Sequence, residues 1–298
     1  MPDFTPVPHV FDRQAAGAFL LYLVLSLLTF GRAVIGHPQT VYVGRGPDPQ
    51  LYIWFMAWWA HAISHGLNPF LTNVIWAPSG VNLAWTANMP LAAWLVYPVT
   101  RGAGPIVSYN LLCLVSPALA GWGAFVLCRY LVRDGWPAAF GGLLFAFSPY
   151  VLSRMLGNMD LTLVWPIPLA VYLTLRRIDG NFGARGFVAA LAILIAAQFL
   201  LFAEVVASAT LFGGIALVLA APAMASGERR RLFSTAALIA AACAAAWAIE
   251  SCAWASVPTL DGFACGPWSK VPPMMLYDAP RYTVELAFQT CLPPRERR

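Results

Sequence analysis

Charged residues are scarce in this sequence, and their scarcity argues against a water-soluble protein. Only 10% of the 298 residues are charged and 60% are hydrophobic, whereas about a quarter of the residues in an average soluble domain are charged. The sequence also lacks a P-loop, a dinucleotide-binding fingerprint and a metalloprotease motif. With no motif of a soluble enzyme class present, an integral membrane protein is the prediction.

The positive net charge does not indicate a nucleic-acid partner. The charge is +5, but the arginines form short clusters between apolar runs, where orientation in a membrane explains them. Three of the six cysteines lie inside apolar runs, and the other three lack the close spacing of a metal-binding knuckle. A disulfide within the second set is left open; the sets are Cys113, Cys128 and Cys243, then Cys252, Cys265 and Cys291.

The apolar runs predict an all-α, polytopic transmembrane bundle of about seven to eight spans. Crossing a bilayer takes about 20 apolar residues, and residues 15–35, 105–128 and 135–153 meet this criterion. Residues 161–175 are a shorter candidate, residues 186–227 allow two helices that turn at Glu204, and residues 232–249 are the last candidate. The first run is interpreted as a retained anchor, because residues 1–14 carry acids and residues 36–38 make a poor signal-peptidase site.

Residues 89–100 leave the number of spans open. This stretch has about a dozen apolar residues interrupted by Pro90 and Pro98, which is short for a span. If it is re-entrant or interfacial, the count is seven. If it crosses, the count is eight, and either the first loop or the arginine pattern falls on the unexpected side.

The arginines predict the orientation of the bundle, because basic residues are retained on the cytoplasmic side. Three clusters fall at every second helix end, so all can face the cytoplasm together. The opposite side then receives the long first loop, residues 36–88, together with residues 154–160 and Glu204. Residues 1–14 form a cytoplasmic tail, residues 15–255 the membrane domain, and residues 256–298 a further tail. The clusters are Arg129 and Arg133; Arg176, Arg177 and Arg185; and Arg229, Arg230 and Arg231.

The first loop is far longer than a simple connection between two helices, which is typical of a functional loop. Within it, residues 51–65 place Trp54 and Trp58 on one apolar helical face. This pattern predicts a short amphipathic helix that lies on the membrane, with its tryptophans at headgroup level.

Asp48 is the first candidate site residue. It precedes Pro49 at the predicted start of this helix, so one interpretation is a helix cap. The other is an ionised carboxylate at the mouth of a membrane cavity, which could act as a general base or bind a divalent metal ion. Both roles can hold for one residue.

His61 and His65 are four residues apart on the same helix, a spacing that could place two imidazoles on one ion. Without an acidic third ligand the pattern is weak, and a pair of interfacial histidines is the simpler interpretation. With Trp58, they are candidates for substrate binding.

Three more ionisable residues are expected on the same side as Asp48. Arg154 and Asp160 lie in a short charged connection, where the simpler interpretations are contact with lipid phosphates and capping of the next helix. Glu204 stands between two apolar runs with no basic residue near it in sequence. An ionisable residue at that depth is a functional candidate, although a helix turn at the interface would also explain it.

These features resemble the class C (GT-C) superfamily of membrane glycosyltransferases, which includes protein O-mannosyltransferases. There a first span leads to a long extracytoplasmic loop with an early acidic residue, the place of Asp48 here. Residues 147–150 (FSPY) followed by Ser153, Arg154 and Asp160 are similar to a second family pattern, although the spacing to Asp160 is longer. Residues 48–50 (DPQ), 58–59 (WW), 65–69 (HGLNP) and 76–83 (WAPSGVNL) resemble a group of bacterial membrane proteins assigned to this superfamily.

The resemblance implies transfer of a sugar from a polyprenyl-phosphate donor to an extracytoplasmic acceptor, at the bacterial inner membrane. Asp48 would deprotonate or orient the acceptor, Asp160 or Glu204 would assist or hold a divalent ion, and Arg154 would bind the donor phosphate. Members are generally longer, so the chain resembles a version truncated after about residue 249. The alternatives are a non-catalytic membrane protein that binds or transports a lipid or polymer, and an inactive fragment.

Overall fold

The computed structural model describes residues 12–75, 80–223, 227, 229–230, 233–241 and 243–244. Within these residues the chain is mostly helical with almost no strand, and six segments are long and apolar enough to cross a membrane. The predicted all-α polytopic bundle is therefore confirmed, and the chain is a multi-pass membrane protein. The six segments are Arg13–Ala33, Pro105–Val132, Gly135–Arg154, Met159–Ile178, Ala184–Leu201 and Ala203–Ala220.

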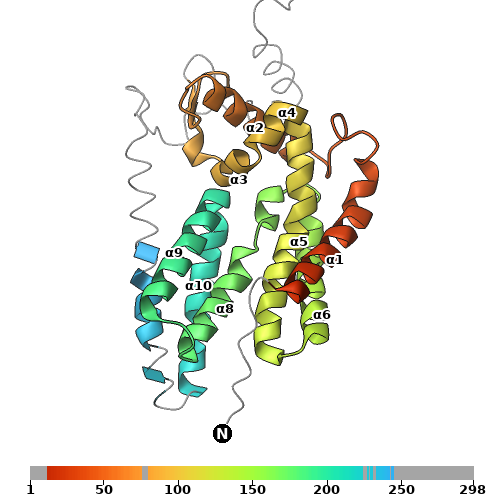
Figure 1. Cartoon of the computed structure of the whole chain (residues 1–298). Coiled ribbons are helices and arrows are strands. Elements are labelled where there is room, and N and C mark those ends of the chain that lie inside the picture. Colours follow the sequence, from red (N-terminus) through yellow and green to blue (C-terminus); the bar gives the residue numbers. More distant parts are fainter. Residues whose placement is uncertain are drawn as a thin grey trace, which may run out of the picture.

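The described elements form two parts, a bundle and a cap at one of its ends (Figure 1). The bundle contains α1 (Arg13–Phe30), α5 (Pro105–Val132), α6 (Gly135–Ala146), α7 (Pro149–Arg154), α8 (Pro166–Ile178), α9 (Ala184–Leu201) and α10 (Ala203–Ala220). The cap contains α2 (Asp48–Ser64), α3 (Pro90–Leu95), α4 (Tyr97–Ala103), and the antiparallel pair β1 (Leu71–Thr72) and β2 (Val81–Asn82). Short 3₁₀ turns are η1 (Gly31–Ala33), η2 (Leu83–Trp85), η3 (Met159–Thr162) and η4 (Ala221–Ala223).

Helix α5 is the centre of the bundle, because it packs against α1, α6 and α8. Glycines on α5 and α6 allow these two helices and α1 to approach one another closely. Cβ atoms at Gly121 on α5 and Gly142 on α6 would both collide with the ring of Tyr22 on α1, whose hydroxyl donates to the carbonyl of Ala139 at 2.8 Å. Three helices therefore meet around one buried tyrosine.

The predicted helix in the first loop is present as α2, but its surroundings differ from the prediction. Trp54, Trp58 and Trp59 are only 8%, 6% and 6% exposed, in a core formed with the rest of the cap and the start of α5. The Trp58 and Trp59 indoles donate to the Pro69 carbonyl and the Asn88 side chain. The expectation that these rings lie in the lipid headgroups is therefore wrong, because the loop folds over them and supplies acceptors for the Trp58 and Trp59 N–H groups.

Two predicted spans contain breaks. Residues 135–153 form α6 and α7, separated where Ser148 precedes Pro149, a residue that begins a helix readily but cannot continue one. The span that starts near residue 161 begins with η3, and α8 starts only at Pro166. Both breaks lie at the cap end of the bundle, so irregular backbone is concentrated there.

Residues 89–100 form most of α3 and α4, which have 6 and 7 residues. A helix of that length rises about 10 Å, far less than the hydrocarbon thickness of about 30 Å. The structure thus supports the interpretation in which this segment does not cross. The turn predicted at Glu204 is also confirmed, since α9 ends at Leu201 and α10 starts at Ala203.

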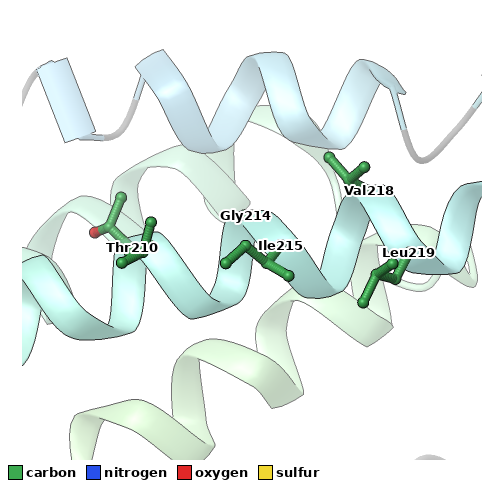
Figure 2. Close-up of a pocket in the computed structure, with 6 residues that line it drawn as sticks. Thr210, Gly214, Ile215, Val218 and Leu219 are labelled. Carbon is green, nitrogen blue, oxygen red and sulfur yellow. The ribbon is translucent and has the colours of Figure 1, made fainter.

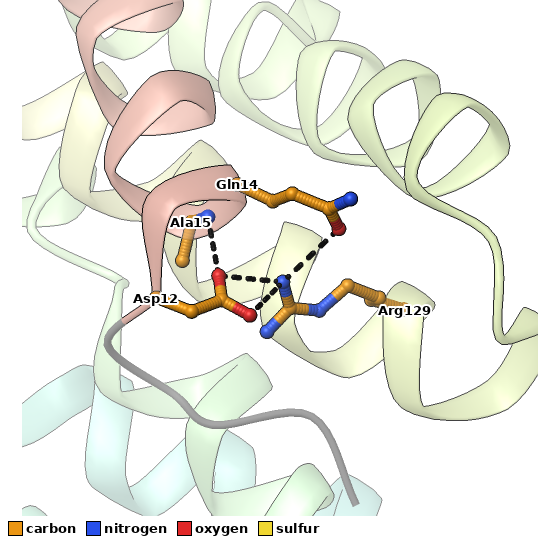
Figure 3. A network of polar contacts seen from close by, with 4 residues as sticks. All are labelled: Asp12, Gln14, Ala15 and Arg129. Atoms are coloured by element: carbon orange, nitrogen blue, oxygen red, sulfur yellow. Dashed lines mark hydrogen bonds and ion pairs between the residues drawn. The ribbon is translucent and has the colours of Figure 1, made fainter. Parts of the chain in front are cut away.

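The first two arginine clusters lie at the end of the bundle opposite the cap, where α5 and α8 end and α9 begins (Figure 1). The buried Arg129 forms an ion pair with Asp12, at 2.8 Å (Figure 3). Its guanidinium also lies against the Phe125 ring. Asp12 also caps α1 by accepting from the Ala15 amide. Burial alone would raise the pKa of Asp12, but hydrogen bonds from Arg129 and Ala15 and the charge of Arg129 hold it below its usual value.

Several predictions concern residues outside the described part of the chain. They include the tail at residues 256–298, motif residues 76–79, Arg231 of the third arginine cluster, and the second cysteine set. The predicted span at residues 232–249 is described only in part. Cys113, Cys128 and Cys243 are free thiols.

Candidate functional site

The candidate site lies where the cap meets the bundle. Asp48 begins α2, Arg154 ends α7, Asp160 lies in η3, and Glu204 is in the first turn of α10. These four residues come from three distant parts of the sequence, and all are at the cap end of the bundle. The prediction that they share one side of the membrane protein agrees with this arrangement.

A tight backbone contact joins the first loop to the connection after α7. The Arg45 amide donates to the Leu156 carbonyl at 2.6 Å. Gly44, with φ +98°, lies so close that a Cβ atom there would be 2.7 Å from the same carbonyl oxygen. Only glycine fits this backbone conformation and this spacing without strain. The contact brings Asp48 to the 155–158 segment.

Asp48 does not cap its helix. The N-cap position is Pro47, which has no side chain able to cap, and Asp48 is the first residue of α2. Its carboxylate instead accepts a hydrogen bond from Asn158 Nδ2 at 3.1 Å. Asn158 Oδ1 in turn accepts from Arg154 at 3.4 Å. Asn158 thus links Asp48 to Arg154, a role that its place in the sequence does not indicate.

Asp160 is the buried carboxylate of the site, with 3% of its surface exposed. It accepts from the Leu161 amide at 2.9 Å, within η3, and Tyr52 on α2 lies close enough for its hydroxyl and the Asp160 carboxylate to interact. Burial, followed by the charges of Asp160 and Asp48, raises the pKa of Tyr52. The tyrosine therefore stays protonated as a donor. Its place one turn after Asp48 on α2 is the signal that could have identified it.

Arg154 and Glu204 are both exposed at the edge of this group. The Arg154 guanidinium lies 5.8 Å from the centre of the Tyr150 ring, one turn earlier on α7. Glu204 is close enough for its charge to act on both Asp160 and Tyr150. The structure therefore gathers Asp48, Asp160 and Arg154 near Tyr52 and Asn158, with Glu204 on the side of Asp160 and Tyr150.

The other three predicted site residues lie elsewhere. His61 is 13 residues after Asp48 on the same helix, which is about 20 Å at 1.5 Å per residue. The His61 and His65 rings are 4.2 Å apart, so the predicted pairing is correct. Their distance from Asp48 separates them from this site, and Trp58 is buried in the cap core. Burial, and then the neighbouring His65, lowers the pKa of His61.

The site has the groups needed for acid–base chemistry on an anionic substrate. Asp48 is exposed and ionisable, and Arg154 can donate to a phosphate. Among the described residues no three histidine, cysteine or acidic side chains are grouped closely enough to hold a metal ion. Any metal at Asp48 and Asp160 would need ligands from a substrate or water.

One apolar pocket lies away from this site. It follows one face of α10 towards the arginine-rich end, beside the next described helical residues (Figure 2). It has a volume of about 420 Å³ and is lined by Thr210, Leu211, Gly214, Ile215, Val218 and Leu219. Most of α10 is exposed in the described chain, as expected for a helix surrounded by lipid.

Comparison with known proteins identifies the family but no relative of established activity. No curated protein matches the chain, and no solved structure matches it. A family model described as a domain of unknown function, DUF6311, matches residues 19–264. The match covers most of the chain, including all four residues gathered at the cap end of the bundle. The chain belongs to the DUF6311 family.

Proposed function

We propose that this chain is a membrane glycosyltransferase that transfers a sugar from a polyprenyl-phosphate donor to an acceptor outside the cytoplasm, at the bacterial inner membrane. The observation that carries the proposal is the link from Asp48 through Asn158 to Arg154, with the buried Asp160 two residues after Asn158. Asp48 and the Asn158 that contacts it are 110 residues apart in sequence, and their meeting point is at the end opposite the arginine clusters.

In the proposed reaction an acceptor hydroxyl gives its proton to a carboxylate as its oxygen attacks the anomeric carbon of the sugar. The bond between that carbon and the phosphate oxygen breaks, and the phosphate leaves with the electron pair. Asp48 is the base because it is exposed and ionisable. Arg154 stabilises the departing phosphate by charged hydrogen bonds, and Asp160 orients the acceptor or assists a divalent ion.

The direct test measures label transfer from a polyprenyl-phosphate sugar in membranes that contain the chain. Asp48→Asn should lower transfer by about 100-fold or more, since a general base contributes about 10²–10⁴. Asp134→Asn is the matched control: Asp134 is an exposed acid that caps α6 at the opposite end of the bundle. Equal transfer by Asp48→Asn and the unchanged chain would refute the assignment of Asp48.

A non-catalytic role in lipid or polymer binding or transport is the second candidate. The observation that favours it is the pair of helix breaks at the site, between α6 and α7 and between η3 and α8, because transporters bind substrates at discontinuous helices. This candidate predicts saturable binding of the polyprenyl-phosphate sugar with no transfer. Binding should then survive in Asp48→Asn and fall in Arg154→Ala, whereas a transferase loses turnover in both.

A further inference from the structure

A buried amide on α5 holds the part of the first loop that precedes Asp48. Asn110 is 3% exposed. Its Oδ1 accepts from the Val43 amide at 3.0 Å, and its Nδ2 donates to the carbonyls of Val41 and Pro38 at 2.8 and 3.2 Å. One side chain thus satisfies three backbone groups of a loop about 70 residues away in sequence.

Tyr109, the residue before Asn110, holds the same point of the loop. It is fully buried, and its hydroxyl donates to the Val43 carbonyl at 3.0 Å. Both polar groups of the Val43 backbone are therefore bound by α5. Buried backbone groups that lose their partners are costly, so these contacts define where the loop leaves the bundle.

Only four residues separate Val43 from Asp48, and the contact between Arg45 and Leu156 lies between them. A shift of the loop at Val43 is therefore passed directly to the Asp48 carboxylate. The other half of the site depends on the same helix. Ser116 on α5 donates to the Thr162 backbone and is bonded to its hydroxyl, at 2.7 and 2.8 Å, two residues after Asp160.

From these contacts we propose that Asn110 is a positioning residue that sets the distance between Asp48 and the 158–160 segment. Asn110 acts through the loop and does not touch the substrate. Its effect on turnover depends on the function proposed above, but its effect on geometry does not. The two can therefore be tested separately.

The geometric test is disulfide formation between cysteines introduced by Asp48→Cys and Asn158→Cys, whose native side chains are hydrogen bonded at 3.1 Å. The pair is made in the full chain in membranes, and each single cysteine variant gives the background from native thiols. Adding Asn110→Ala should slow oxidant-induced pairing by about tenfold or more, since three buried hydrogen bonds are lost.

Ser108→Ala is the matched control. Ser108 is also fully buried on α5, but it is bonded to Thr100 and not to the loop. Pairing should proceed at the unchanged rate in this variant. Pairing that is equally fast in Asn110→Ala, or equally slow in Ser108→Ala, overturns the proposal. If Asn110→Ala does not accumulate in membranes, Tyr109→Phe removes only the hydroxyl bonded to Val43 and should slow pairing in the same direction.

Transfer of labelled sugar provides the second measurement, with the native Asp48 and Asn158 in place. Asn110→Ala should lower kcat by about tenfold with little change in KM for the donor, because misplacing a reacting group costs rate more than binding. Slower cysteine pairing with no transfer by the unchanged chain would refute the transferase and support the positioning role. An equal loss of kcat in Ser108→Ala would overturn the positioning role.

Discussion

Gly44→Ala should release the first loop from the connection after α7. An L-residue at φ +98° costs about 1–2 kcal/mol. The added Cβ would also lie 2.7 Å from the Leu156 carbonyl oxygen and 3.1 Å from its carbon, both backbone atoms. Relieving that collision breaks the hydrogen bond from the Arg45 amide, worth about 1 kcal/mol. The total of about 2–3 kcal/mol lowers the equilibrium constant for docking of the loop onto the connection after α7 roughly 30- to 160-fold.

Hydrogen–deuterium exchange of the peptide that contains Arg45 measures this release in the detergent-solubilised full chain. Gly46→Ala is the matched control, because Gly46 has φ +90° but nothing lies within 4 Å of the added Cβ. It incurs only the conformational strain, so the Arg45 amide should exchange roughly 5- to 30-fold faster. Equal exchange in the two variants would refute the argument, because the collision with Leu156 would then contribute nothing.

Three other predictions follow from the two ends of the molecule. Asp12→Ala should cost about 2–3 kcal/mol of unfolding free energy, since it removes a helix cap and the ion pair with the buried Arg129. Asp134→Ala removes only a cap and should cost about 1 kcal/mol. Chemical unfolding of the two variants measures this difference. The pKa of Asp12 in the folded protein is lowered, so the stabilisation from its carboxylate is present above the ordinary value of 3.8 and is lost as the pH falls through the folded pKa. The melting temperatures of the native chain and of Asp12→Asn should therefore converge as the pH is lowered through this range. A difference in melting temperature that stays constant with pH would contradict this. His61→Ala should leave sugar transfer within about twofold of the native rate, because His61 is about 20 Å from Asp48 along α2, and a large loss would place the histidines in the site.

Most of the spans, and the end of the bundle at which the site lies, were predictable from the sequence. Lengths of apolar runs define the spans, and the arginine clusters place Asp48, Arg154 and Glu204 together on the other side. The burial of α2 was not predictable, because a helical face with Trp54 and Trp58 suits a lipid interface and a protein core equally well. Only the fold of the surrounding loop decides between these two environments.

The links between the site residues could not be predicted either. Asn158 and Tyr52 become part of the site through side-chain contacts between segments that no local pattern connects. The histidine pair shows the reverse case. Helical periodicity correctly predicts that His61 and His65 meet, but it does not relate them to the 154–160 connection.

The hydrogen bonds of Asn110 also constrain the order in which the chain can assemble. The loop at residues 38–43 leaves the ribosome well before its partners on α5, which are 66–72 residues further along. Asp48 must wait longer still, for Asn158. Contacts this distant in sequence form late and slowly. During synthesis the tryptophans of α2 therefore stay uncovered until α5 and the following hairpin have been inserted.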